Sequence, residues 1–573
     1  MTQKKREREF GILSSRRRGL FVVPVGRGPY AEYGVAKTQS LKAEVGELVE
    51  YTLCPGHRAD RARITRTFGP VDQLTSLSEI AIHGHGLRTS FSDEVEQEAA
   101  SLRQVSPETR EDLRHFSFVT IDPEGAQDHD DAVCAIPDTA CPGGHIIWCA
   151  IADVAHFVRS GTALDTAAKQ RGNSTYFPDL VLPMLPSALS ADLCSLREGV
   201  DRPCLAVCMK IDGEGRLISH QFQRVLIRSR ASLSYQKAQR IMDGINENGC
   251  REFSLKDMLL RLQNAFRCRL RERQQRQPLE LDLDRRKVIF SADGKIESIG
   301  IDERHECHRM IEEFMILANV CAATTLIECG TPHLCRAHDP PKSDRIRDLE
   351  TAMAGLGAPR TNWCYDSPAD LNLLMAYADR EGKGDLAAHA ILRGMSQAVY
   401  RVAPSGHFGL NLPHYAHFTS PIRRYSDLLT HRILIRALGL GPDGATDNEL
   451  ERLSKLASYL SQCERRSVAA EHETLDRFAA RFLTRSVGKV FSGIIASVQP
   501  FGLFVRIDAG LAEGLIPVSK LGFEYFEYDE DTHALISKNS GKEFRLGQTI
   551  SVILKQVDIP RGRLSFILNR QGS

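Results

Sequence analysis

The chain has 573 residues, of which 42% are hydrophobic and 26% are charged, and its formal net charge is +1. This is the composition of a soluble globular protein, and the length suits about four domains. No apolar run approaches the roughly 18–20 residues that cross a bilayer. The charged start, MTQKKREREF, also lacks the apolar core of a signal peptide. We therefore expect a cytoplasmic protein with no membrane partner.

Cysteine spacing and charge distribution add two further expectations. Fifteen cysteines occur without a CxxC pair, and Cys204 and Cys208, the nearest to one, have no companion pair at zinc-ligand spacing. We therefore expect reduced thiols and no structural zinc. Residues 1–18 hold seven Lys or Arg and two Glu, which predicts a basic arm. A second basic run, RCRLRERQQRQ at 267–277, is typical of the solvated face of a helix.

A small β-barrel is predicted over residues 19–72. Short runs of β-forming residues are separated there by turn-forming Gly, Pro and Asp. The runs are GLFVVPV (19–25), EYGVA (32–36), GELVEYTL (46–53) and RARITRTF (61–68). Several short strands in so few residues are typical of a five-stranded oligonucleotide-binding (OB) barrel. Residues 73–110 then form a connector with some helix.

Four aspartates stand within ten positions of the segment IDPEGAQDHDDAV (121–133), namely Asp122, Asp128, Asp130 and Asp131. Two of them, Asp128 and Asp130, face the same side if the chain is extended, and a turn at Pro123 and Gly125 would bring all four together. Such carboxylates would have raised pKa values unless a divalent cation shared them, and oxygen ligands suit Mg²⁺ or Mn²⁺. A hydrated acidic turn is the alternative that this segment alone leaves open.

The central residues 111–485 predict one α+β domain, with strands first and helices after about residue 255. Within it, HFTSPIRRYSDLLTHR (417–432) predicts a helix with Ser420 as N-cap. Arg423 and Arg424 then lie in the first helical turn, where free N–H groups and guanidinium groups both favour a phosphate. The alternative for one of the two arginines is a structural ion pair with Asp427.

A second barrel is predicted at the C-terminal end, over residues 487–569, from the same pattern of short strands. It carries three aromatic residues on or beside its first strands, Phe491, Phe501 and Phe504. Aromatic rings of such barrels stack on the bases of single strands. The alternative is that some of the rings fill the barrel core, and Phe504 suits either place.

These parts together indicate metal-assisted phosphoryl chemistry on a nucleic-acid strand that the barrels guide. Two metal ions would activate water and stabilise the leaving oxygen, while an arginine neutralises the added charge. No GxxxxGK[ST] loop is present, so we expect no coupling to nucleotide hydrolysis.

Four long motifs resemble the ribonuclease II / ribonuclease R (RNB) family, and the likeness is closer to ribonuclease R. They are TIDPEGAQDHDDAV, STYFPDLVLPMLPSALSADLCSL (174–196), IEEFMILAN (311–319) and HFGLNLPHYAHFTSPIRRYSDLLTHR (407–432). The resemblance implies an α+β multidomain fold with a central RNB-type catalytic domain. Small OB-fold RNA-binding domains flank it, a cold-shock-like barrel before it and an S1-type barrel after it.

The resemblance also implies an activity and roles for single residues. The activity is processive 3′→5′ hydrolysis of single-stranded RNA with a free 3′ end, by a monomer, to nucleoside 5′-monophosphates and a short end product. The four aspartates match the metal and catalytic acids, and Asp130 matches the one whose loss abolishes cleavage. Tyr176 matches the aromatic residue that stacks on the 3′-terminal base, and Arg423 matches the contact to the scissile phosphate. Glu471 aligns with an acid that affects turnover.

The sequence departs from the family pattern at two points. Cys335 stands where a second base-stacking aromatic residue is expected, and one N-terminal barrel is visible where two are usual. Degradation of paired RNA is therefore left open. Two other functions also remain open, a non-catalytic RNA-binding protein on the same fold and an endonuclease or DNA nuclease.

Overall fold

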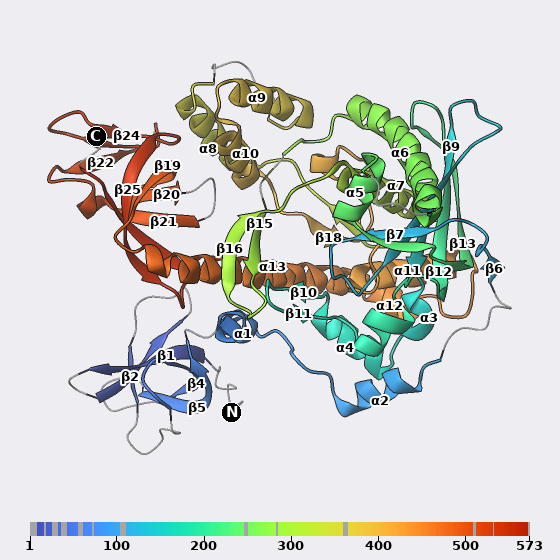
Figure 1. The fold of residues 1–573 in the computed structure, drawn as a ribbon, viewed down its shortest axis with the longest axis horizontal. Helices are drawn as coiled ribbons and strands as arrows, with labels where there is room; N and C mark the ends of the chain where they lie inside the picture. The colour runs from blue at the N-terminus through green and yellow to red at the C-terminus, as the bar shows by residue number, and fades with distance from the viewer. Residues whose placement is uncertain are drawn as a thin grey trace.

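The computed structural model describes most of the chain and arranges it as a large central domain with two small barrels on one side (Figure 1). The described residues are 9–16, 19–25, 32–35, 43–54, 61–71, 74–103, 110–245, 250–281, 283, 285–358, 365–507, 512–530 and 532–570. One long helix, α13 (Leu453–Leu483), runs from the central domain to the C-terminal barrel.

The N-terminal barrel is closed, in the strand order β1-β2-β3-β5-β4. Its strands are β1 (Glu9–Arg16), β2 (Gly19–Pro24), β3 (Tyr33–Val35), β4 (Glu47–Cys54) and β5 (Arg61–Pro70). The predicted start at residue 19 is wrong by one strand, because β1 pairs with both β2 and β4 to close the barrel. The described part of the predicted basic arm is thus a strand that buries Leu13. Residues 1–8 and 17–18 of that arm lie outside the described residues.

The predicted connector holds two helices, α1 (Leu74–Gly84) and α2 (Asp93–Ser101). Leu77 of α1 is fully buried in a cluster with Phe478 of α13. The connector therefore fixes the N-terminal barrel against the central domain through this apolar contact.

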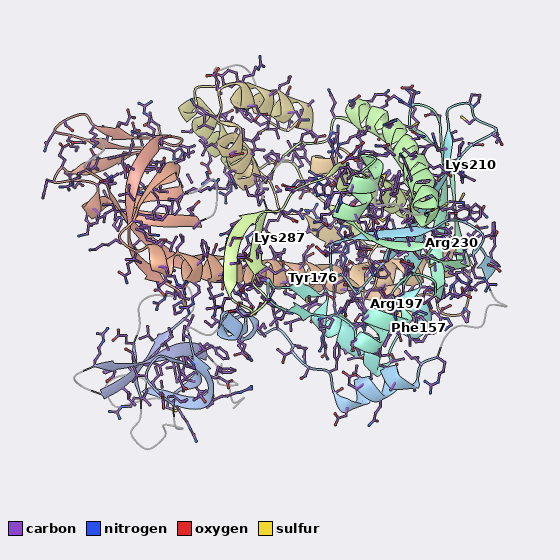
Figure 2. All side chains as sticks on the ribbon, viewed as in Figure 1. Phe157, Tyr176, Arg197, Lys210, Arg230 and Lys287 are labelled. Carbon is purple, nitrogen blue, oxygen red and sulfur yellow. The ribbon has the colours of Figure 1, made fainter. Side chains whose placement is uncertain are left out.

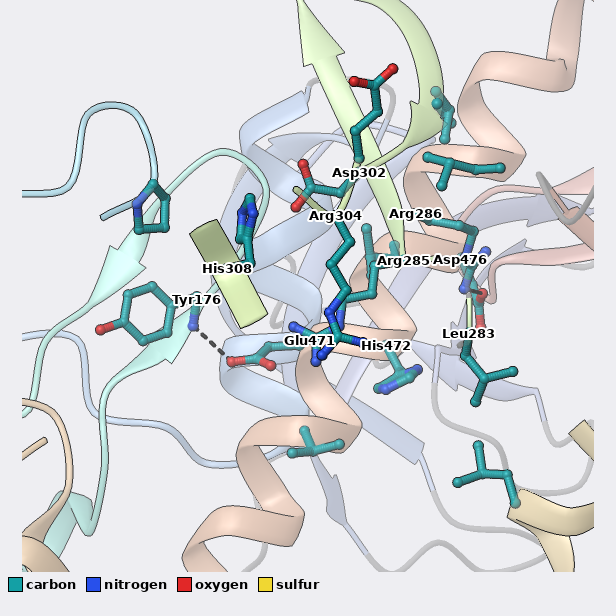
Figure 3. Close-up of a pocket in the computed structure, with 18 of the residues that line it drawn as sticks. Tyr176, Leu283, Arg285, Arg286, Asp302, Arg304, His308, Glu471, His472 and Asp476 are labelled. Atoms are coloured by element: carbon teal, nitrogen blue, oxygen red, sulfur yellow. Dashed lines mark hydrogen bonds and ion pairs between the residues drawn. The ribbon is translucent and has the colours of Figure 1, made fainter. Parts of the chain in front are cut away.

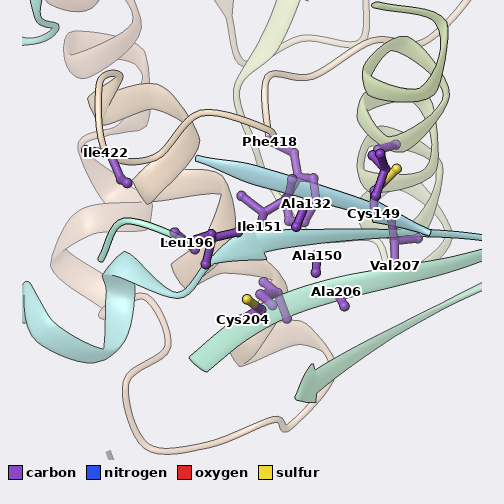
Figure 4. Packing of buried hydrophobic residues seen from close by; sticks show 14 of the residues in the cluster. Ala132, Cys149, Ala150, Ile151, Leu196, Cys204, Ala206, Val207, Phe418 and Ile422 are labelled. Carbon is purple, nitrogen blue, oxygen red and sulfur yellow. The ribbon is translucent and has the colours of Figure 1, made fainter. Parts of the chain in front are cut away.

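A seven-stranded sheet forms the centre of the large domain, in the order β14-β7-β8-β9-β12-β13-β6. Its strands are β6 (Glu111–Asp112), β7 (Val119–Asp122), β8 (Asp131–Pro137), β9 (His145–Ala152), β12 (Asp201–Ile211), β13 (Leu217–Arg228) and β14 (Ala231–Ser234). The inner strands are almost wholly apolar because both faces are covered. Figure 4 shows Phe418 beside Ala132 and Ile151 of this core, to which Leu196 and Ile422 also belong.

Helices and short strands complete the central domain. The helices are α3 (Val154–Phe157), α4 (Ala163–Arg171), η2 (Ala188–Leu193), α5 (Tyr235–Met242), α6 (Cys250–Arg276), α7 (Glu306–Glu328), α8 (Ser343–Gly355), α9 (Pro368–Arg380), α10 (Gly384–Gly394), η3 (Phe408–Leu410), α11 (Tyr425–Ala437), α12 (Asp447–Glu451) and η4 (Thr484–Ser486). The strands are β10 (Thr175–Tyr176), β11 (Val181–Leu182), β15 (Arg286–Phe290), β16 (Ile296–Ile301), β17 (Cys335–Ala337) and β18 (Val399–Arg401).

Helix α7 corrects one expectation about apolar runs. By length and composition it could cross a membrane, with a mean hydropathy of 1.5 over its most apolar window. However, 72% of that window is buried inside the molecule, where α7 packs on the central sheet and on α6. It is therefore a core helix of the folded domain.

The basic run 267–277 is only in part the solvated face that its sequence suggests, since Arg267 and Arg271 are exposed but other arginines are not. Three of its arginines, Arg269, Arg273 and Arg276 of α6, point at the buried carboxylate of Glu313 on α7. The Arg273 Nη1 atom lies 2.5 Å from Glu313 Oε1. Burying a carboxylate is costly unless cations pair with it, so these arginines hold α6 and α7 together.

The C-terminal barrel is closed in the order β19-β20-β21-β26-β25. Its strands are β19 (Val490–Gln499), β20 (Gly502–Ile507), β21 (Ala512–Pro517), β25 (Thr549–Asp558) and β26 (Arg563–Leu568), with the turn η6 (Val518–Lys520) after β21. A separate sheet of β22 (Phe526–Asp529), β23 (Ala534–Ser537) and β24 (Glu543–Phe544) is inserted after that turn. The end of α13 enters the barrel core through Ala479, Ala480 and Leu483, which joins the two domains.

Buried histidines predict acid sensitivity of the fold. His431 is fully buried, donates Nε2–H to the Phe418 carbonyl at 2.7 Å, and has its pKa lowered by burial to about 4. The unfolded chain binds this proton near pH 6.5 and the folded chain only near pH 4, so His431 costs stability as pH falls through that window. We expect the thermal midpoint of His431→Asn to fall less between pH 7 and pH 5 than that of the parent. An exposed control, His115→Asn, should follow the parent, and identical pH slopes for all three proteins would contradict the assignment.

Candidate active site

The acidic segment is a loop that joins two neighbouring strands of the central sheet. Asp122 ends β7 and Asp131 opens β8, and the turn between them uses Gly125 at φ +80°, a conformation that suits glycine. The loop is tied to the chain after η2, because the Ser195 hydroxyl donates to the Gln127 carbonyl at 2.6 Å. The predicted turn is therefore present, and it holds the carboxylates where β7 ends and β8 begins.

Asp130 is the buried acid of the four, with a relative exposure of 3%. Its Oδ1 accepts a hydrogen bond from the Ile422 N–H at 2.8 Å, and its Oδ2 lies 3.4 Å from Arg423 Nε. Within the described part of the chain, Oδ2 has no hydrogen-bond donor. Burial raises the pKa of Asp130 well above the usual value of a carboxyl, although Arg423 opposes this shift.

The other three acids each have a distinct environment. Asp122 Oδ2 accepts from His129 Nδ1 at 2.7 Å, and Asp128 Oδ2 accepts from the Tyr176 hydroxyl at 2.7 Å. Burial, together with the charge of Asp122, raises the pKa of Asp131 to about 7. The sequence analysis did not predict His129 as a site residue. Its position between Asp128 and Asp130 is the only local indication of such a role.

The two arginines have different partners. Arg423 donates to the Ser420 hydroxyl at 2.9 Å and its side chain is 43% exposed. Arg424 makes two bonds to the buried carboxylate of Asp427, at 2.8 and 2.9 Å. The structural ion pair that the sequence left open is therefore made by Arg424, and Arg423 remains directed at the aspartates.

The predicted helix start at Ser420 is wrong, because α11 begins at Tyr425. Arg424 has an extended backbone, at φ −137°, and forms an isolated β-bridge with Asn173. The two arginines thus precede the helix. The backbone N–H of Ile422, which lies in the expected first turn, donates to Asp130.

Tyr176 and Glu471 meet beside the acids. The Tyr176 N–H donates to Glu471 Oε1 at 2.8 Å, which joins β10 to α13 (Figure 3). Figure 2 places Tyr176 near the middle of the molecule, beside α13. Tyr176 as a whole is 39% exposed although its hydroxyl is bonded, and it lines the cavity, where it is accessible to a ligand.

One continuous cavity of about 3210 Å³ connects these residues to the C-terminal barrel. Most of the predicted site residues line it, namely Asp122, Asp128, Asp130, Asp131, Tyr176, Arg423, Arg424, Glu471, Phe501 and Phe504. Phe501 and Phe504 lie edge to face, with ring centroids 6.0 Å apart. Phe491 is half-buried and packs against the barrel core instead, which is the alternative for these rings.

Cys335, at the position of the expected second aromatic residue, is 2% exposed. It lies in β17, and its Sγ is 3.4 Å from His333 Nε2. The Cys335 side chain is therefore not among the residues that line the cavity, and β17 supplies no stacking partner for Tyr176.

The acids are close together but are not arranged as a finished metal site. Among the described residues, no group of three or more His, Cys, Asp or Glu side chains has the arrangement of a metal-binding cluster. Asp122 and Asp128 are engaged with His129 and Tyr176, as described above. Their carboxylates would have to exchange or share these partners to hold a cation.

Comparison with known proteins agrees with this architecture. A family model described as RNB domain matches residues 110–439, and one described as S1 RNA binding domain matches residues 485–568. Ribonuclease R of Escherichia coli (strain K12) is 35% identical over 564 residues, covering 96% of this chain and 69% of that protein. Mycoplasma genitalium RNase R, solved in complex with ribose methylated single-stranded RNA, matches with a TM-score of 0.91 at 25% identity, over 99% of this chain and 90% of that one.

The RNB domain model matches more than half of this chain, and the fold agrees with it. The chain therefore belongs to the RNB family. Within that family its similarity is to ribonuclease R, and it is a 3′→5′ exoribonuclease of RNA degradation.

Fold alone does not carry an activity in this group. Yeast Ssd1, described as a pseudonuclease, shares the fold with a TM-score of 0.75 over 99% of this chain and 83% of that one, at 14% identity. Catalysis therefore depends on the residues that line the cavity and not on the fold alone.

Proposed function

We propose that this enzyme degrades single-stranded RNA processively from a free 3′ end. It acts as a monomer, by hydrolysis that Mg²⁺ or Mn²⁺ assists, and it releases nucleoside 5′-monophosphates and leaves a short end product. The observation that carries the proposal is the shared cavity, which is lined by the four aspartates and Arg423 of the central domain and by Phe501 and Phe504 of the C-terminal barrel. The complex of the Mycoplasma relative with single-stranded RNA supports the substrate class.

The negative charge of the four aspartates is not fully compensated by neighbouring groups, which favours binding of a divalent cation. Asp130 Oδ2 is buried without a donor among the described residues, and burial raises the pKa of both Asp130 and Asp131. A cation shared by such carboxylates favours their ionised form, and oxygen ligands suit Mg²⁺ or Mn²⁺. Two ions held by Asp122, Asp128, Asp130 and Asp131 would supply the charge that activates water and stabilises the leaving oxygen.

Arg423 binds the scissile phosphate in this proposal. A guanidinium has five N–H donors in one plane, and one contact to Ser420 leaves donors for a phosphate. Its exposure into the cavity and its place 3.4 Å from Asp130 put positive charge beside the reacting group. Fixed positive charge there stabilises the additional negative charge of the transition state.

The 3′-terminal base stacks on Tyr176. Its hydroxyl is held by Asp128 and its backbone by Glu471, so the ring has a fixed orientation beside the acids. A ring stacks on any of the four bases, which fits degradation without sequence preference. Cleavage ends when the remaining strand is too short to reach this ring. The position of the ring therefore sets the number of nucleotides in the end product.

The experiment that tests this function uses one 5′-labelled single-stranded RNA and the DNA of the same sequence, each incubated with the enzyme and Mg²⁺. We expect the RNA to give 5′-mononucleotides and one short labelled end product, and the DNA to stay intact. Labelled fragments of intermediate length from internal cuts, equal loss of DNA, or no cleavage at all would each contradict the proposal.

Replacing Tyr176 by Ala is expected to lengthen the short end product while cleavage continues. The loss of stacking removes roughly 1–3 kcal/mol of binding to the terminal base, so short strands leave before the last cuts. The matched control is Tyr176→Phe, which keeps the ring and removes only the bond to Asp128. High-resolution gels of the labelled product should show the parental end product for Phe and a longer one for Ala. An unchanged product from the Ala variant would show that Tyr176 does not set the final register.

A further inference from the structure

The hairpin of β15 and β16 is the place where three parts of the molecule meet. Val288 of the hairpin packs in one cluster with Phe478 of α13, Leu77 of α1 and Ile559 of the C-terminal barrel. Arg286 adds an ion pair to Asp476 of α13, with 2.9 Å between Nη2 and Oδ1. The hairpin therefore lies where the C-terminal barrel adjoins the central domain.

The turn between β25 and β26 reaches the same point on α13. Arg477 Nε donates to the Pro560 carbonyl at 2.8 Å. Gly562 has φ +61°, and a Cβ atom there would lie 2.9 Å from the Asp476 Cβ, so only glycine allows this close approach. Hairpin and turn thus flank Asp476 from two domains.

Next to these anchoring residues stand two arginines, Arg285 in the hairpin and Arg563 after the turn. Both are exposed and line the cavity that contains the aspartates (Figure 3 labels Arg285, between Tyr176 and Asp476). Across the described ranges of the chain, neither guanidinium has a hydrogen bond or ion pair to another side chain.

Three acidic residues near the two arginines are already paired with other basic side chains. Asp476 pairs with Arg286, Asp302 with Lys287, and Asp558 with Arg561. Glu303 and Glu471 also line this cavity and oppose anion binding, since neither carboxylate is paired with a cation among the described residues. A guanidinium that is exposed in a channel and has no protein partner is well suited to a phosphate.

We propose that Arg285 and Arg563 bind the phosphate backbone of the RNA where the strand passes from the C-terminal barrel into the central domain. This inference rests on the proposed function, because it takes the cavity as the path of the substrate. The two residues contact phosphates and no bases, so they position the strand independently of its sequence. Among the described residues neither arginine pairs with any of the four aspartates, so we expect both to act on binding.

The test measures how RNA binding depends on salt, with the full chain carrying Asp130→Asn to prevent cleavage. Arg285→Gln, Arg563→Gln and the double variant are compared with Lys295→Gln, which removes a charge from the exposed tip of the same hairpin outside the cavity. One lost phosphate contact lowers the slope of log K against log salt by about 0.7 for a single strand. We expect a drop of about that size for each single variant, twice that for the double variant and none for Lys295→Gln, and a parental slope for Arg285→Lys.

Each remaining outcome overturns the inference. Slopes equal to that of Lys295→Gln would show that the arginines contact no phosphate, and weaker binding with an unchanged slope would indicate a structural effect. Thermal midpoints confirm that each variant is folded. The slope is measured without cleavage, so it tests these contacts even if the products of the unsubstituted enzyme are not those of a 3′ exonuclease.

Discussion

Replacing Asp130 by Asn is expected to lower the rate of RNA hydrolysis by roughly 10³-fold or more, as loss of a central catalytic group does. Asn keeps the oxygen that accepts from the Ile422 N–H, so the loop retains its position. It loses the negative charge that holds a cation and faces Arg423. Chemistry should therefore fail while the substrate still enters the cavity.

Two measurements distinguish this result from misfolding. The thermal midpoint should stay at or above the parental value, because the change removes a buried charge whose ionisation burial disfavours. RNA binding measured by fluorescence anisotropy should be retained. Asp93→Asn, an exposed change at the start of α2, serves as the charge-matched control with full activity. Residual hydrolysis close to the parental rate would remove Asp130 from the mechanism.

Substitutions of Arg423 and of Arg424 are expected to have different effects, the first on the rate of hydrolysis and the second on the stability of the fold. Arg423→Ala should reduce the rate by about 10²–10³-fold, the usual effect of losing one group that stabilises transition-state charge. Arg423 is 43% exposed and approaches Asp130 only to 3.4 Å, a longer contact than the two bonds of Arg424, so the thermal midpoint of Arg423→Ala should change less than that of Arg424→Ala. Arg424→Ala leaves the fully buried Asp427 carboxylate without its cation and should cost roughly 3 kcal/mol of unfolding free energy.

Steady-state kinetics and chemical denaturation of both variants check this division. Arg423→Lys should restore part of the activity, because Lys supplies the charge without the planar pair of donors. Asp427→Asn is the partner control and should destabilise the fold as Arg424→Ala does. Equal loss of stability in the Arg423 and Arg424 variants would contradict the assignment of separate roles.

The barrels and the central α+β domain follow from local patterns, but some of their limits do not. Strand alternation and turn residues predict both barrels. Strand β1 (Glu9–Arg16) was assigned to a basic arm because charged residues flank its short apolar alternation. The start of α11 depends on a bridge between Arg424 and Asn173, about 250 positions apart in the chain. A capping rule based on neighbouring residues contains no information about such a contact.

The candidate site shows the same division between local and distant information. Spacing alone brings the four aspartates together, because they lie in one loop between paired strands. Their partners come from elsewhere: Tyr176 for Asp128, Ile422 for Asp130. The charge of Glu313 likewise explains three arginines that looked solvated, and it lies on another helix. Contacts of this kind require the folded chain.

The most direct test of the account compares one RNA sequence as a linear strand and as a covalently closed circle, each with Mg²⁺ and the unsubstituted enzyme. In the proposed mechanism, cleavage begins only at a free 3′ end that has entered the cavity and reached Asp130 and Tyr176. We predict that the linear RNA is converted to 5′-mononucleotides and a short end product, while the circle remains closed under the same conditions. Opening of the circle at a rate comparable to loss of the linear strand would contradict the claim.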